Sequence, residues 1–169
     1  MPARSYAHHF ETTVEVDAPP EPLFAQLDEH EVLASHMMQS SAMMGGSRMF
    51  FEFDAARGRA VGSRIRMFGR MLGLTLDVSE VVTERIVPER KVWETVGTPK
   101  LLVVGSYRMG FRVKPRGGRS ELAVFIDYDD PPGAAKVLGR LLGPTYARWC
   151  TISMAEGAAA AFRRQKLAA

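Results

Sequence analysis

The sequence contains a single cysteine, Cys150, so no disulfide bond can form within the chain. It also lacks any apolar run approaching the roughly 20 residues that a helix needs to cross a bilayer. The opening stretch, MPARSYAHHFETTVEV, has no apolar segment of the kind found in secretory signal peptides. From these absences we expect a soluble, cytoplasmic protein with no integral membrane association.

A strong charge of one sign is missing as well. The 22 lysines and arginines nearly balance the 19 aspartates and glutamates, which leaves a formal net charge of +3. Because the arginines are spread along the chain rather than grouped, the charge pattern does not favour a nucleic-acid partner. At 169 residues the chain is most simply one domain, 1–169, large enough to bury a core without disulfides or metals. We expect residues 1–8 to be flexible.

Motifs of the common catalytic classes are absent. The sequence has no G-x-S-x-G, H-E-x-x-H, C-x-x-C or phosphate-binding loop, and no G-x-G-x-x-G between a strand and a helix. His8 and His9 belong to the end expected to be flexible, and His30 lies among acidic residues, which favours a solvated side chain. His36 could contact the polar end of a ligand or lie at a surface helix end. We therefore assign no catalytic residue, no metal site and no cofactor.

The order of apolar patterns predicts a mixed architecture. Phe10 to Asp17 alternates like a strand, and the following APPEPLFAQLDEH places two prolines at the start of a helix. EVLASHMM predicts a second short helix or turn. After Gly45-Gly46 the chain becomes rich in strand patterns for about eighty residues, without helical patterns between them, which favours an antiparallel meander. Thr98-Pro99 is expected to form a turn, and 101–115 a strand.

The last part of the chain changes from strand period to helix period. Residues 134–166 place apolar side chains at helical spacing, with a kink or break expected at Gly143-Pro144. A helix of this length needs an apolar partner, and the apolar face of the meander is the only large candidate. We expect the side of the helix that packs on the meander to carry Val137, Leu138, Leu141, Leu142, Trp149, Ile152 and Met154.

Three stretches of the sequence resemble one known superfamily. The opening VEVDAPPEPLFAQLDEHEVLASHM, the hairpin YRMGFRVKPRGGRSELAVFIDYD and the closing LLGPTYARWCTISMAEGAAAAF resemble the SRPBCC superfamily, which joins START lipid-transfer domains, birch-pollen-allergen-like proteins and polyketide cyclases. The resemblance covers nearly the whole chain. It implies an α+β helix-grip fold, in which a curved antiparallel sheet of about six or seven strands wraps around a long C-terminal helix. Two short helices follow the first strand.

The resemblance further implies a cavity between sheet and helix that binds apolar or amphipathic small molecules. Five of the ten methionines fall between Met37 and Met49 and could form an adaptable rim for such a cavity, or fill loose core under a loop. Combined with strand alternation, the resemblance predicts the cavity lining as His36, Met37, Phe51, Phe53, Met67, Met71, Leu76, Trp93, Tyr107, Met109, Phe111, Ile126, Tyr128 and Trp149.

Several polar and aromatic positions allow two interpretations. The inward hydroxyls of Tyr107 and Tyr128 could bond within the protein or hold a ligand oxygen. Trp93 is expected to face inward together with Lys91 and Thr95. Asp77 faces outward by alternation, unless a bulge turns it inward as a candidate acid or base. Trp149 packs on the sheet or forms a cavity wall, and Cys150 is expected to be a small buried residue.

The leading hypothesis from the sequence is binding, transport or sensing of a hydrophobic or amphipathic small molecule, lipid-like or polyketide-like, without catalysis. One alternative is an enzyme similar to the polyketide cyclase, aromatase and dehydratase branch. Another is a protein-interaction module resembling Hsp90 activators, which a large exposed apolar patch would support. The sequence indicates neither the identity of the ligand nor the oligomeric state.

Overall fold

The computed structural model describes residues 4–35, 49–71 and 73–168, and of Met71 it describes the backbone alone. Within this part no helix combines the length and hydropathy that crossing a membrane requires. The elements follow one another as β1 (His8–Val16), α1 (Pro20–Asp28), α2 (His30–Leu33), β2 (Met49–Phe53), β3 (Arg64–Met71), β4 (Leu74–Ile86), β5 (Arg90–Lys100), β6 (Tyr107–Arg116), β7 (Arg119–Tyr128) and α4 (Ala135–Leu167).

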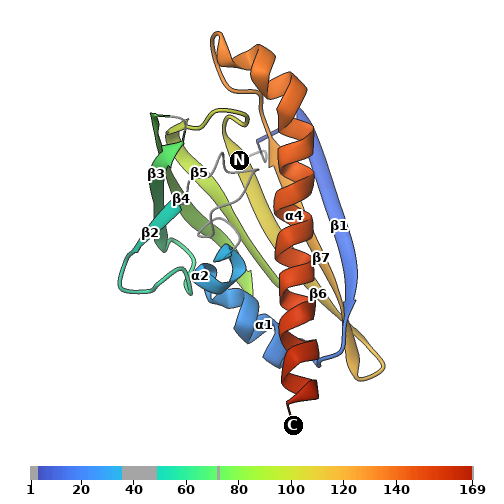
Figure 1. The fold of residues 1–169 in the computed structure, drawn as a ribbon. Coiled ribbons are helices and arrows are strands. Elements are labelled where there is room, and N and C mark those ends of the chain that lie inside the picture. Colours follow the sequence, from blue (N-terminus) through green and yellow to red (C-terminus); the bar gives the residue numbers. More distant parts are fainter. Residues whose placement is uncertain (1–3, 36–48, 72, 169) are drawn as a thin grey trace.

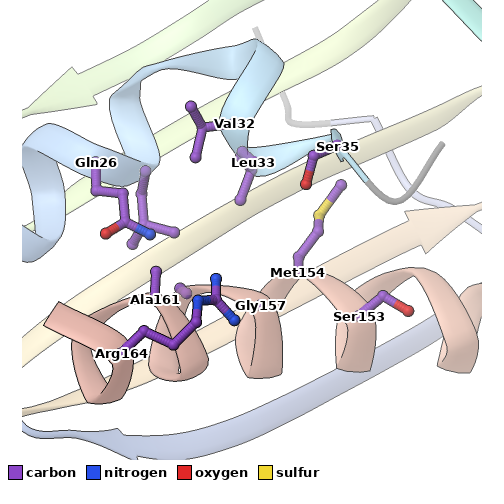
Figure 2. Close-up of a pocket in the computed structure, with 11 residues that line it drawn as sticks. Gln26, Val32, Leu33, Ser35, Ser153, Met154, Gly157, Ala161 and Arg164 are labelled. Carbon is purple, nitrogen blue, oxygen red and sulfur yellow. The ribbon is translucent and has the colours of Figure 1, made fainter. Parts of the chain in front are cut away.

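The strands form one seven-stranded antiparallel sheet in the order β1-β7-β6-β5-β4-β3-β2. Helix α4 lies across one face of this curved sheet, and α1 and α2 lie beside the C-terminal half of α4 (Figure 1). Figure 2 shows α1 and α2 facing α4 from the opposite side of a pocket. The predicted α+β architecture, with a curved sheet around a long closing helix and two short helices after the first strand, is confirmed.

Alternation along the strands decides which side chains face α4. Trp93 of β5 lies opposite Met109 of β6, which lies opposite Ile126 of β7, and all three are buried. The other face of the sheet carries charge, as the sequence predicted. There Arg66 and Asp77 form an ion pair at 2.8 Å. One face of the sheet is therefore the floor of the hydrophobic core and the other faces water.

Two predicted strand boundaries were wrong. Thr98-Pro99 does not form a turn, because β5 continues to Lys100, which pairs with Asp77 of β4. The next strand begins at Tyr107, so residues 101–106 form a connection rather than the first half of β6. Pairing with β4 thus overrides the local turn preference of Thr98-Pro99.

Helix α4 departs from the prediction in two ways. It runs unbroken through Gly143-Pro144, with Pro144 exposed. It also turns a stripe of mostly small residues toward the core rather than its leucines. The exposed fractions of four apolar side chains in its first turns are 68% for Val137, 41% for Leu138, 71% for Leu141 and 48% for Leu142.

Close backbone contacts explain why the first turns of α4 are oriented this way. A Cβ added to Gly139 would lie 2.3 Å from the Cδ atom of Pro131. A Cβ on Gly143 would lie 3.0 Å from the carbonyl oxygen of Val103. Only glycine permits such an approach without displacing the neighbouring chain. The glycine face therefore packs inward, and the leucines lie on the solvent side.

A buried ion cluster joins the end of α1 to the sheet. Lys91 of β5 is fully buried, and its Nζ atom lies 2.9 Å from both the backbone oxygen and Oδ1 of Asp28. Arg85 of β4 donates to the same carboxylate, with Nη2 2.8 Å from Oδ2. Burial opposes ionisation of Asp28, but the hydrogen bonds from Arg85 and Lys91 outweigh it and hold the pKa of Asp28 below its usual value. Burial lowers the pKa of Lys91, against the effect of Asp28.

We predict that Asp28→Ala lowers the free energy of unfolding by about 3 kcal/mol at neutral pH, because Lys91 would remain buried without its counter-charge. The difference from wild type should shrink as pH falls. Since the folded state lowers the pKa of Asp28, the unfolded chain takes up the proton first, and the contribution is lost below the unfolded pKa of about 3.8. Urea denaturation at several pH values measures both effects.

The control is the double variant Asp28→Ala/Lys91→Met, which removes both charges and should recover most of the lost stability. Equal loss in the single and double variants would show that the ion pair is not what the substitution disturbs.

Candidate functional site

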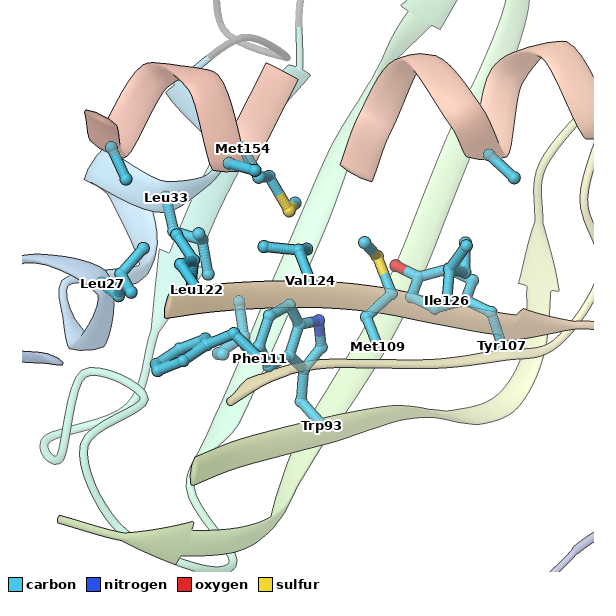
Figure 3. Packing of buried hydrophobic residues seen from close by; sticks show 14 of the residues in the cluster. Leu27, Leu33, Trp93, Tyr107, Met109, Phe111, Leu122, Val124, Ile126 and Met154 are labelled. Atoms are coloured by element: carbon cyan, nitrogen blue, oxygen red, sulfur yellow. The ribbon is translucent and has the colours of Figure 1, made fainter. Parts of the chain in front are cut away.

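Three polar side chains from separate elements meet inside the apolar core. His30 of α2, Glu80 of β4 and Tyr107 of β6 are only 3%, 2% and 4% exposed. Aromatic rings surround the imidazole edge-on, with centroid separations of 5.2 Å to Trp93, 5.8 Å to Phe51 and 6.1 Å to Phe53. Figure 3 shows Tyr107 and Met109 pointing from the sheet toward α4 in this core. We call His30, Glu80 and Tyr107 the polar cluster.

The sheet positions two members of the polar cluster and the helical segment positions the third. The Tyr107 hydroxyl donates a hydrogen bond to Oε1 of Glu80. The Nε2 atom of His30 lies 3.4 Å from Oε2 of the same carboxyl group. Between the two strands, Thr95 of β5 accepts from the backbone N–H of Tyr107 at 3.1 Å. His30 reaches the cluster because Asp28, two residues earlier, is held against the sheet.

Burial keeps nearby hydroxyl and thiol groups protonated. Desolvation, followed by the charge of Glu80, raises the pKa of Tyr107 well above 10. Desolvation, followed by interaction with Cys150, does the same for the pKa of Tyr146. Burial also raises the pKa of Cys150 to about 12, so its thiol is a poor nucleophile at neutral pH. Tyr107 is thus a hydrogen-bond donor in this site, and Cys150 is the buried residue that the sequence predicted.

Two atoms of the polar cluster make no hydrogen bond with a described residue, although one of them, Glu80 Oε2, lies 3.4 Å from Nε2 of His30. His30 Nδ1 and Glu80 Oε2 are buried and have no hydrogen-bond partner among the described residues. Such an atom typically costs about 1–3 kcal/mol, and native proteins rarely keep one without a reason. The cluster therefore has hydrogen-bonding capacity to offer a bound molecule. In the same described part, no three His, Cys, Asp or Glu side chains are grouped to hold a metal ion.

Most of the residues predicted to line a cavity are buried in the core, and their role in ligand binding stays a prediction. The buried ones are Met67, Leu76, Trp93, Tyr107, Met109, Phe111, Ile126 and Tyr128. Phe51, Phe53 and Trp149 are half-buried and pack against the same core. His36 and Met37, with the rest of the methionine-rich stretch up to residue 48, lie outside the described residues, as does the side chain of Met71.

The prediction for His30 was wrong, and Glu80 was not identified. The acidic neighbours of His30 in the sequence suggested a solvated residue, but the α1–α2 turn directs its ring into the core. A usable signal for Glu80 did exist. It falls in the same alternation as the inward-facing Leu76, Val78 and Val82, so a charged residue stands where the strand pattern requires an apolar one.

Ion pairs show where the other polar residues discussed from the sequence, Asp77, His8 and His9, are placed. Asp77 faces outward as alternation predicted, even though the pairing with β5 shifts register after it. His8 and His9 lie in β1 rather than in a loose end, and His8 Nε2 is 2.9 Å from Asp130. Asp130 also faces Arg140 at 3.4 Å. The ring of His8 also stacks on the buried Tyr128, with ring centroids 4.8 Å apart.

We predict that Tyr107, one of the four tyrosines, ionises only when the protein unfolds at high pH, because its burial raises its pKa well above 10. The ultraviolet absorbance of tyrosinate measures this. Tyr107→Phe should remove one late-titrating group and leave the early phase unchanged. Complete titration of all four tyrosines in the folded protein would contradict the buried geometry.

Comparison with known proteins relates the chain to solved structures. No family model matches it, and no curated protein matches it. A protein from Thermus thermophilus is 15% identical with a TM-score of 0.67, over 94% of this chain and 99% of that one. The Zhui aromatase/cyclase from Streptomyces sp. R1128 is 14% identical with a TM-score of 0.63, over 94% and 95%. A truncated norcoclaurine synthase from Thalictrum flavum is 19% identical with a TM-score of 0.60, over 94% and 96%.

At these identities the similarity demonstrates a common fold. Each match spans nearly the full length of both chains, so it includes the sheet, the two short helices and α4 together. The protein therefore has a helix-grip fold, which the resemblance in its sequence implied.

Proposed function

We propose that the protein binds a hydrophobic or amphipathic small molecule between α4 and the apolar face of the sheet, with the polar end of the ligand at the polar cluster. The observation that carries this proposal is a pair of buried atoms that make no hydrogen bond with a described residue, His30 Nδ1 and Glu80 Oε2. Of these two atoms, Glu80 Oε2 lies 3.4 Å from Nε2 of His30. A ligand hydroxyl could donate to Glu80 Oε2, and a second ligand polar group could bond to His30.

The surroundings of the polar cluster suit the apolar part of such a ligand. Trp93, Met109 and Phe111 provide aromatic and flexible sulfur-containing surfaces beside it. Each square ångström of apolar surface removed from water contributes roughly 25 cal/mol. A mainly apolar lining with a few directed polar groups is the common composition of small-molecule sites. The proposal includes the expected cytoplasmic location, which the single buried thiol of Cys150 fits.

Known proteins with this fold add support from their names alone. One similar structure is an aromatase/cyclase, and another is a norcoclaurine synthase point mutant in complex with a transition-state analogue. Both names imply that a helix-grip protein can receive a small organic molecule. At 14% and 17% identity they do not indicate which molecule this chain would bind.

An enzyme of the cyclase or dehydratase type is the second candidate, and the hydrogen bond between Tyr107 and Glu80 favours it. A hydroxyl and a carboxyl group in a water-excluded site are the groups that an acid–base mechanism uses, but the pKa of Tyr107, raised well above 10 by burial, opposes release of its proton. Turnover of a polyketide thioester that is lost in Tyr107→Phe would support this candidate over a carrier. The exposed apolar residues at the start of α4 are the feature that favours the interaction-module hypothesis.

We predict that the protein binds 2-naphthol about tenfold more tightly than naphthalene, because one hydroxyl can use the free acceptor of Glu80. In Glu80→Leu this preference should fall to nearly one, while naphthalene affinity changes little. Titration calorimetry or quenching of Trp93 fluorescence measures both constants.

The matched control is Asp77→Leu, which removes a carboxylate from the opposite face of the same strand and should leave the preference intact. Equal affinities for the two probes in wild type, or a preference that survives Glu80→Leu, would refute the proposed orientation. Native mass spectrometry of the freshly purified protein would reveal any natural ligand directly.

A further inference from the structure

A hollow lies between the short helices and the C-terminal half of α4, and no residue of the polar cluster lines it. It has a volume of about 300 Å³. Leu27, Leu33, Met154 and Ala158 form its apolar floor and belong at the same time to the outer layer of the core. Gln26 of α1 and Arg164 of α4 lie at its rim (Figure 2). We call this hollow the helix pocket.

A glycine in the middle of α4 helps to keep the helix pocket open. Gly157 lines it, and a Cβ added there would meet no atom of the described residues within 4 Å. Gly139 and Gly143 on the same helix differ, because close contacts with Pro131 and Val103 require them. Glycine inside a helix costs about 1 kcal/mol relative to alanine. No close contact among the described residues requires glycine at position 157. The absence of a side chain there adds space to the pocket.

Charge at the rim indicates which molecule would fill the space. Arg164 is exposed and forms no ion pair with a described residue, whereas Lys166, two residues further along the helix, pairs with Asp17. Figure 2 shows the Arg164 side chain extending along α4 on the side of the helix that borders the pocket. A guanidinium offers a planar fork of donors that matches a carboxylate. The amide of Gln26 on the facing helix can add another donor.

We propose that the helix pocket is a second binding site, which takes a short-chain amphiphile with an anionic head. The carboxylate lies at Arg164 and Gln26, and the alkyl chain lies on the floor between Leu33, Met154 and Gly157. A volume of about 300 Å³ is at the small end of known ligand sites, which restricts the alkyl chain to a short one. This site is independent of the polar cluster, and neither proposal requires the other.

The test compares octanoate with 1-octanol, which share an alkyl chain and differ in charge. Wild type should bind octanoate about threefold to tenfold more tightly, and added salt should reduce the difference. Arg164→Gln should abolish the preference and leave octanol binding unchanged. The matched control is Arg163→Gln, because the neighbouring arginine carries the same charge but does not line the pocket.

Filling the pocket gives a second, charge-independent test. Gly157→Leu should weaken both probes at least tenfold, and its melting temperature should not fall below that of wild type, because leucine favours the helix and its Cβ would have no described atom within 4 Å. Glu80→Leu should leave octanoate binding unchanged, which separates this site from the polar cluster. The proposal is overturned if octanoate binds no better than octanol, if Arg163→Gln has the same effect as Arg164→Gln, or if Gly157→Leu retains binding.

Discussion

The interior of this protein depends on two opposite charges that are buried at the end of α1. Asp28 and Lys91 lose their water and neutralise each other, and Arg85 adds a second, partly exposed cation on the same carboxylate at the edge of the core. Separate charges in that position would destabilise the fold, so the α1–α2 corner is held wherever the carboxylate can reach both cations. His30 and Leu33 follow within a few residues. The ion pairs of Asp28 thereby help to position the His30 ring in the polar cluster and Leu33 in the wall of the helix pocket.

Contact between α4 and its surroundings changes along the length of the helix. Near its start, Gly139 and Gly143 bring the helix backbone against the chain at Pro131 and Val103, and the leucines lie outside. Near its end, Gly157 has no such contact among the described residues and borders open space. Glycine thus permits close packing at one end of α4 and leaves a hollow at the other. The sequence of α4 alone cannot distinguish these two roles, because they depend on whether another segment of the chain lies opposite the glycine.

Sequence patterns predicted the architecture well because period-two alternation determines which strand residues are buried. Trp93, Tyr107 and Met109 were all placed correctly by this rule. Errors arose where tertiary contacts overrode a local preference, as at Leu141, exposed because glycines occupy the inward face. Errors also arose where the residue type suggested exposure but the position is buried. Glu80 falls in the inward-facing alternation of β4, and His30 is buried by the turn between α1 and α2, which no local sequence pattern indicates.

The carrier and the enzyme hypotheses differ in the acceptor that the Tyr107 hydroxyl needs. The proton of this hydroxyl is directed at Glu80 Oε1, so in the observed state the hydroxyl is already satisfied and Oε2 is the acceptor left for a guest. A ligand hydroxyl can therefore bind without disturbing Tyr107, which is all that a carrier needs. Catalysis by Tyr107 would require its hydroxyl to leave Glu80 for a substrate oxygen, at the cost of a buried hydrogen bond. Under the proposed function, the ligand leaves this bond in place, whereas proton transfer would need a substrate that replaces it.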